Sequence, residues 1–327
     1  MASILQQIPP ETAHHIGLRL LKLLPFTIKC DDPSLTVKTS FGDIKNPVGL
    51  AAGFDKHAAY VTELSKLGFG YIVAGTVTRN PRKGMPKPRI IRRPGEMALV
   101  NAMGFPNPGL EKFVENLSKH RADCPVLASI ADEELDKLVE CFVAVQKTSD
   151  AVEVNISSPN TPGLSKYFEP VFFKDVAAVL HSAKQRPTYL KLPPFTENTT
   201  GLIERIVGIW LENGFEGVTA VNTLLVEEPG VKAGRGGLSG RPLFPILLDC
   251  IKILRNRFGE GFEINAVGGI HTGQDAFTAL YHGADTVQIY TALTYRGLYT
   301  VKKIVEELKD AMKSKGFKKI DEARSRR

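Results

Sequence analysis

A lysine inside an apolar run is the residue of this sequence that most needs a chemical explanation. Lys191 lies between Leu190 and Leu192, in a segment that predicts a buried strand. Burial of an ammonium group is unfavourable unless an anionic partner compensates the charge. Two partners fit: a bound cofactor whose electron density the lysine stabilises on reduction, or a structural ion pair with a carboxylate such as Glu153.

Other polar side chains stand directly after predicted strands. The segment 155–161 contains two asparagines, two serines and a threonine, Asn222 and Thr223 follow another apolar run, and Lys56 comes soon after a third. In a parallel barrel the active site forms where the strands end, so these side chains predict a site. Taken alone, the serines and proline of residues 157–159 are equally typical of a turn.

A glycine pair and a second loop suggest where an anion binds. Gly268 and Gly269 follow one predicted strand, and Tyr290 and Thr291 follow the next, each before a segment able to begin a helix. Glycines permit close backbone approach and helix N-termini favour anions, so a mononucleotide phosphate fits there. The alternative is that the glycine pair is only a tight turn.

Short β-branched runs alternate with helix-length segments from about residue 46 onward, which is typical of βα units and a parallel sheet. The predicted strands are residues 48–52, 71–74, 126–130, 151–155, 188–192, 217–221, 263–267 and 286–289. The predicted helices include residues 132–147, 175–184, 202–213, 243–257 and 274–281. Eight such units predict an α/β fold, a closed (β/α)8 TIM barrel. A doubly wound sheet is disfavoured because no Gly-x-Gly-x-x-Gly turn follows the first strand.

The chain before the barrel predicts a short N-terminal helical extension. Two prolines set a helix start, and apolar residues at helical spacing, including Ile16 and Leu20, give residues 9–24 an amphipathic pattern. We therefore divide the chain into an amphipathic extension, residues 1–30, and a barrel domain, residues 31–327. The helix either closes the bottom of the barrel or offers an apolar surface to a membrane or lipophilic ligand.

Composition and charge narrow the class of protein. With 43% apolar and 24% charged residues, the 327-residue chain is typical of a globular protein with a full core. Its net charge of +7 is partly due to a basic run in residues 313–327, but no zinc finger or helix-turn-helix pattern supports nucleic-acid binding. The four scattered cysteines predict reduced thiols, no metal site and no iron–sulfur cluster held by this chain alone. No secretory signal begins the sequence, so we expect a cytoplasmic protein.

Several blocks together resemble the dihydroorotate dehydrogenases, which oxidise dihydroorotate to orotate in pyrimidine (UMP) biosynthesis with FMN as cofactor. The resemblance covers nearly the whole chain. The blocks are NPVGLAAGFDK (residues 46–56), NISSPNTPGL (155–164), GGLSGRPL (236–243), AVGGI (266–270) and QIYTAL (288–293).

The resemblance implies roles for individual residues. Ser158 is the expected base that removes the C5 proton of dihydroorotate while hydride passes from C6 to FMN, and Thr161 and Phe105 shape the proton relay. The expected substrate contacts are Lys56, Asn101, Asn155, Asn160, Asn222 and Thr223. The expected FMN contacts are Ala52, Gly53, Thr76, Asn101, Ser129, Asn155, Lys191, Val221, Gly240, Gly269, Tyr290 and Thr291. Residues 230–240 would form a mobile flap over the site.

The electron acceptor differs among members of this family. Serine at position 158 is similar to the quinone-linked class, and so is the N-terminal helix, in which His14, together with Arg92, resembles quinone-channel residues. This resemblance implies a quinone partner and peripheral attachment to the inner face of the cell membrane. Three positions depart from the pattern of that class: Ala102 replaces an arginine, Ser129 an asparagine and Leu224 a threonine.

Alternative functions remain open at the level of sequence. The acceptor can be fumarate, or a partner electron-transfer subunit that carries FAD and an iron–sulfur cluster. A related dihydropyrimidine reductase would share the phosphate site without needing a carboxylate contact at Lys56. A barrel aldolase or phosphate-sugar isomerase would instead use Lys191 as a Schiff-base nucleophile.

Overall fold

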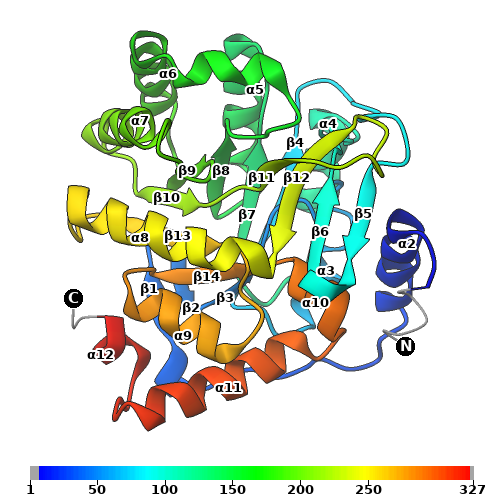
Figure 1. Cartoon of the computed structure of the whole chain (residues 1–327), viewed down its shortest axis with the longest axis vertical. Coiled ribbons are helices and arrows are strands. Elements are labelled where there is room, and N and C mark those ends of the chain that lie inside the picture. The colour runs from blue at the N-terminus through cyan, green and yellow to red at the C-terminus, as the bar shows by residue number, and fades with distance from the viewer. Residues whose placement is uncertain (1–6, 325–327) are drawn as a thin grey trace.

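Eight parallel strands close into a barrel in which neighbours along the chain are also neighbours in the sheet (Figure 1). The structure, a computed structural model, describes residues 7–324. The barrel strands are β3 (Val48–Leu50), β4 (Tyr71–Val77), β7 (Val126–Ile130), β8 (Ala151–Asn155), β9 (Thr188–Leu192), β10 (Gly217–Ala220), β13 (Glu263–Val267) and β14 (Thr286–Ile289). The predicted (β/α)8 fold is confirmed. Seven strands begin and end within two residues of the prediction, and β4 extends three residues further.

Helices surround the barrel and cover the outer faces of its strands (Figure 1). They are α3 (Val61–Ser65), α4 (Leu110–Ser118), α5 (Leu135–Val145), α6 (Pro170–Ser182), α7 (Thr200–Glu212), α8 (Phe244–Phe258), α9 (Gly273–Tyr281), α10 (Thr291–Arg296), α11 (Thr300–Ser314) and α12 (Ile320–Arg324). All five predicted helices are present. The largest error is α6, which begins at Pro170 rather than residue 175, because proline is well tolerated in the first turn of a helix.

Local sequence explains how the βα units are formed. Strands β7, β8 and β9 are buried along their whole length, as expected when helices cover one face and the barrel interior the other. Helix α9 begins at a capping box, in which the Thr272 side chain accepts from the Asp275 backbone and Asp275 accepts from the Thr272 backbone. This cap fixes the point at which the chain turns from β13 into the helix.

A small antiparallel sheet lies outside the barrel. It consists of β5 (Ile90–Arg93), β6 (Ala98–Asn101), β11 (Leu224–Glu227) and β12 (Arg235–Gly240), in the order β11-β12-β6-β5. The predicted flap, residues 230–240, therefore contains a strand paired on both sides rather than an irregular loop. We call this four-stranded element the lid sheet.

The opposite end of the barrel is covered by a hairpin formed by β1 (Val37–Thr39) and β2 (Gly42–Ile44). Between the two strands, Phe41 places its ring 5.2 Å from Tyr71 and 5.8 Å from Tyr189, near the amino ends of two barrel strands. Helix α2 (Pro10–Leu21) instead packs against β5 of the lid sheet. The interpretation of the N-terminal helix as a bottom cap is therefore wrong, because the hairpin occupies that position.

Helix α2 leaves part of its apolar surface in contact with solvent. Its predicted stripe includes Ile16 and Leu20, which are 38% and 40% exposed, and the stripe continues to Leu23, which is 75% exposed. The first six residues of the predicted extension lie outside the described residues. Within residues 7–324, no helix is both long and apolar enough to cross a membrane.

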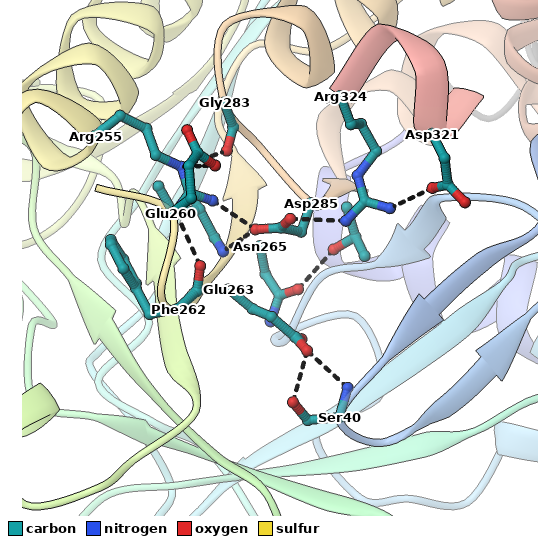
Figure 2. A network of polar contacts seen from close by, with 12 residues as sticks. Ser40, Arg255, Glu260, Phe262, Glu263, Asn265, Gly283, Asp285, Asp321 and Arg324 are labelled. Atoms are coloured by element: carbon teal, nitrogen blue, oxygen red, sulfur yellow. Dashed lines mark hydrogen bonds and ion pairs between the residues drawn. The ribbon is translucent and has the colours of Figure 1, made fainter. Parts of the chain in front are cut away.

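The C-terminal helix is held to the barrel by a network of charges (Figure 2). Asp285 lies between Arg255 and Arg324, with ion-pair distances of 2.7 Å on both sides, and Arg324 also contacts Asp321. Asp285 additionally accepts a hydrogen bond from the backbone of Ile264 in β13. The end of the described chain is thus fixed far from α2, on the other side of the molecule (Figure 1).

Replacing Asp285 with asparagine is expected to lower the free energy of unfolding by about 3 kcal/mol, because both arginines lose their shared carboxylate in a largely buried setting. Chemical denaturation measures this change. The matched control is Asp249→Asn, since Asp249 is 72% exposed and its ion pair with Lys252 should contribute less than about 0.5 kcal/mol. Equal effects of the two substitutions would contradict the prediction.

Candidate active site

A cavity opens at the carboxyl ends of the barrel strands, beneath the lid sheet. Most residues predicted for catalysis, substrate and cofactor line it. They are Ala52, Gly53, Lys56, Thr76, Asn101, Phe105, Asn155, Ser158, Asn160, Lys191, Val221, Asn222, Thr223, Gly240, Gly269, Tyr290 and Thr291. The predicted residues Ser129, Thr161, His14 and Arg92 lie near the cavity but are not part of its lining.

Asparagine side chains form a connected group on one wall of the cavity. The Asn155 amide donates to the Thr76 hydroxyl (3.2 Å), and the Asn222 amide donates to the Asn155 side-chain oxygen (3.2 Å) and to the Ser157 hydroxyl (3.1 Å). The Thr223 backbone donates to the Asn222 side-chain oxygen (2.8 Å). These bonds fix which side-chain atoms remain available to a ligand.

The lid sheet completes the wall above the asparagines. Asn101, at the end of β6, donates to the Gly237 carbonyl at 3.2 Å and accepts at its own carbonyl from Asn160 at 3.1 Å. A Cβ at Gly237 would lie 2.0 Å from the Thr223 hydroxyl. Glycine at position 237 is therefore required for β12 to pack this closely against the cavity.

Ser158 lies beside a buried threonine. The Thr161 hydroxyl is 3.4 Å from the Ser158 hydroxyl and donates to it, while only 7% of Thr161 is exposed. Phe105 lines the same cavity and has a positive φ of 53°, and its carbonyl accepts a hydrogen bond from the Asn107 side chain. The structure thus brings together the three residues that were predicted for proton removal.

Lys191 forms the ion pair that was one of the two interpretations of its burial. The residue lines the cavity, and its ammonium group lies 3.4 Å from Glu153, which is fully buried. The same carboxylate oxygen accepts from the Ser129 hydroxyl at 2.9 Å, and Ser129 is bonded to Thr76 at 2.9 Å. Ser129 therefore lies one layer behind the cavity wall and contacts its lining through Thr76.

Lys56 is the second lysine of the cavity, and its surroundings are different. Its ammonium group donates to the Gly53 carbonyl at 2.5 Å, but it forms no ion pair with a carboxylate among residues 7–324. Burial lowers the pKa of Lys56 to about 8. A positive charge without a counter-ion is well suited to bind a carboxylate ligand.

The glycine pair after β13, where an anion site was predicted, lies at one end of the cavity. Gly268 and Gly269 have φ values of 137° and 75°, which favour glycine. A Cβ at Gly269 would lie 2.4 Å from the backbone nitrogen of Phe244. Thr291, the first residue of α10, lines the same end, and its hydroxyl lies 3.0 Å from the Ser239 hydroxyl. Polar groups and close backbone approach therefore converge where a phosphate was predicted.

Comparison with known proteins identifies the family. A family model described as dihydroorotate dehydrogenase matches residues 34–312. The chain belongs to the dihydroorotate dehydrogenase family. A dihydroorotate dehydrogenase (quinone) of Coxiella burnetii (strain Dugway 5J108-111) is 38% identical, with 92% of this chain and 94% of the relative covered. A relative with the same name from Rhodopseudomonas palustris (strain BisB5) is 35% identical, with 93% and 89% covered.

Solved structures show the same likeness. The crystal structure of DHODH from Eimeria tenella in complex with ferulenol has a TM-score of 0.88 and 29% identity, covering 96% of this chain and 94% of that chain. The ligand-free Eimeria tenella structure also gives a TM-score of 0.88, at 28% identity, covering 97% and 99%. Enzymes of this family depend on a flavin.

Of the two residues predicted for a quinone channel, His14 belongs to α2 and Arg92 to β5, the strand against which α2 packs. The His14 ring packs edge-on against Phe54 (4.8 Å), and Phe54 packs against Tyr290 (5.3 Å), which lines the cavity. Burial, with the nearby charge of Lys56, lowers the pKa of His14 to about 3, so its ring is neutral near pH 7. Arg92 donates to the Ile8 carbonyl at 2.6 Å.

The departures from the quinone-linked pattern have local structural roles. Ala102 is buried, and its backbone donates to the Arg89 carbonyl at 2.9 Å. Arg89 in turn forms an ion pair with Glu11 of α2 at 2.5 Å, so an arginine next to position 102 still links the helix to the lid sheet. Leu224 begins β11 and pairs with Leu238 of β12.

Sequence reasoning missed several lining residues. Gln288 is a polar residue inside the apolar strand β14, and the logic that singled out Lys191 would also have found it. His271 comes two residues after the glycine pair and is 2% exposed. Ile90 and Leu99 of the lid sheet and the nearby Met103 carry no such signal, since apolar residues of this kind look like ordinary core residues.

Proposed function

We propose that this chain oxidises (S)-dihydroorotate to orotate in pyrimidine biosynthesis, with FMN as its bound cofactor and a quinone as the electron acceptor. The observation that carries the proposal is the convergence of Ser158, Lys191 and Lys56 on one cavity of a dihydroorotate dehydrogenase barrel. A hydroxyl base, a cation for the cofactor and a cation for the substrate are the groups that this reaction requires. Relatives named dihydroorotate dehydrogenase (quinone) support a quinone as the electron acceptor.

The residues that would hold FMN extend across the mouth of the barrel. The phosphate is assigned to Gly240, Gly269, Tyr290 and Thr291, all of which line the cavity. The ring is assigned to Ala52, Gly53, Thr76, Asn101, Asn155, Lys191 and Val221, with Ser129 supporting it from behind. When bound, FMN accepts the hydride that leaves C6 of dihydroorotate.

Ser158 takes the proton from C5 in this proposal. A serine hydroxyl is a weak base by itself, so it must pass its own proton to a neighbouring acceptor. The Thr161 hydroxyl at 3.4 Å is positioned to join that relay, and Phe105 lines the same cavity as Ser158. Because Thr161 is buried, the relay has a fixed geometry.

Substrate binding follows from the same wall of polar side chains. Dihydroorotate carries a carboxylate and two ring amide edges, so it needs a cation together with side chains that both donate and accept. Lys56 supplies the cation, and Asn101, Asn155, Asn160, Asn222 and Thr223 supply the hydrogen bonds. The bonds among these asparagines support the proposal, since an orientation fixed before binding lowers the entropy lost on binding.

The quinone is assigned to the region between α2 and the cavity. His14 and Arg92 lie there, and the aromatic contacts from His14 through Phe54 to Tyr290 form an apolar path toward the flavin site. The exposed Leu23 and Phe26 beside α2 would contact the inner face of the cell membrane, from which a lipophilic acceptor arrives. The enzyme would thus be cytoplasmic and peripherally attached.

Substitution of Ser158 by alanine is expected to slow flavin reduction by dihydroorotate about 10²–10⁴-fold, the usual contribution of a positioned proton acceptor. Anaerobic stopped-flow absorbance at the flavin band measures the rate. Reduction of the same variant by dithionite serves as its control, because this reaction needs no base. A Ser158→Ala variant reduced by dihydroorotate at the wild-type rate would contradict the assignment.

Orotate affinity is expected to depend on the charge of Lys56. Since the pKa of Lys56 in the free protein is about 8, the side chain is mostly charged below pH 8 and mostly neutral above it. The dissociation constant of orotate should therefore be nearly constant from pH 6 to 7 and rise about tenfold per pH unit above pH 8. Lys56→Gln should bind orotate at least about tenfold more weakly at pH 7 and without this pH dependence. Fluorescence or calorimetric titration measures orotate binding by the wild type and by Lys56→Gln. Equal orotate affinity of the two proteins would indicate that the natural substrate is neutral.

The acceptor is tested by reducing the purified protein anaerobically with dihydroorotate and then adding quinone, fumarate or NAD in parallel. We expect reoxidation by quinone alone, and Arg92→Ala should raise the KM for quinone about tenfold, or ~1.4 kcal/mol. Turnover with fumarate would refute the quinone assignment. Failure with all three acceptors would instead indicate a partner subunit.

A further inference from the structure

Glu153 is a fully buried carboxylate that the reaction described above does not use. It belongs to β8, and in the barrel register it stands opposite Tyr189 of β9, whereas Lys191 stands opposite Asn155. Glu153 therefore lies closer than Lys191 to the amino end of the barrel, by two residues. Lys191 lines the cavity, but Glu153 does not, so the carboxylate supports the lysine from below.

The contacts of the carboxylate involve mainly one of its oxygens. Oε1 lies 3.4 Å from the Lys191 ammonium and accepts from Ser129 at 2.9 Å. Oε2 is buried without a hydrogen-bond partner among the described residues. A buried ion pair is no more stabilising than a well-packed apolar pair of the same volume. Fold stability therefore does not explain why a charged residue occupies position 153. The effect of the Glu153 carboxylate on Lys191 is the remaining explanation.

The physical effect on the cavity is electrostatic. An isolated ammonium at the cavity floor would present a full positive charge to the ring of a bound flavin and would favour its reduced form. A carboxylate 3.4 Å away offsets most of this potential, and it also fixes the position of the flexible lysine side chain. Both effects arise in a buried region where salt screens little.

We propose that Glu153 is a positioning residue that holds the Lys191 ammonium at the cavity floor, partly neutralises it, and so lowers the reduction potential of the bound flavin. The inference rests on the proposed function, because it requires FMN in this cavity. A lower potential makes the reduced flavin a stronger donor to its acceptor.

The test compares the two-electron reduction potential of bound FMN in the wild type and in Glu153→Gln, measured anaerobically against reference dyes. Glutamine keeps the size of the side chain and can still accept from Ser129, but it carries no charge. We expect at least a tenfold increase in the preference of the site for reduced over oxidised flavin, which corresponds to about +30 mV for a two-electron couple. An unchanged or lowered potential would overturn the proposal.

Two further variants separate a specific effect from a general one. Glu263→Gln is the matched control, since Glu263 begins β13, bonds to Ser40 and Tyr189 at the opposite end of the barrel, and lies outside the cavity lining. It should leave the potential unchanged. In a Lys191→Met background, Glu153→Gln should shift the potential by less than in the wild-type background, because Glu153 then has no lysine to hold in position. An equal shift in Glu263→Gln, or a full shift in the absence of Lys191, would refute the role.

Glu153→Asp provides the test if the glutamine variant fails to fold. Aspartate keeps the charge but moves it away from Lys191 by one methylene, so the potential should rise above the wild-type value, by less than the about 30 mV expected for full loss of the charge. A chain that takes up no FMN would refute the proposed function together with this inference. A flavin-loaded Glu153 variant with the wild-type potential would refute this inference alone.

Discussion

Closure of the barrel between its first and last strands is the constraint on which the rest of the structure depends. The pairing of β14 with β3 joins residues about 240 positions apart, through bonds such as that from the Ala51 backbone to the Ile289 carbonyl at 3.1 Å. Closure brings the carboxyl ends of all eight strands to one mouth. Gly53 and Tyr290, which follow the two joined strands, consequently become neighbours, with the tyrosine hydroxyl 3.5 Å from the glycine carbonyl.

The barrel strands were predictable from the sequence because burial on both faces leaves continuous apolar runs. Lys191 stood out for the same reason, as a charge inside such a run. Glu153 was named as one possible partner, because consecutive strands of a barrel are neighbours, but the sequence left open whether this carboxylate or a cofactor compensates the lysine. Only the register of β8 against β9 shows that Lys191 both pairs with Glu153 and lines the cavity.

The lid sheet escaped prediction for a different reason. Residues 235–240 include three glycines, and such a composition normally indicates a loop rather than a strand. Their pairing with residues 98–101 is specified by contacts across about 140 positions and by the absence of side chains at points such as Gly237. The bottom hairpin was missed similarly, because its short strands gain their burial from Phe41 and the barrel rather than from their own pattern.

The lid sheet also constrains the order in which the molecule can assemble. The β5–β6 hairpin is made early in synthesis, but its partner β12 is added only after six of the eight barrel strands. Until then, the edge of β6 that carries Asn101 has no strand beside it, and the roof of the cavity does not exist. A nascent chain therefore cannot retain a cofactor beneath this sheet until most of the polypeptide has left the ribosome, and chaperones would meet an incomplete, cofactor-free barrel.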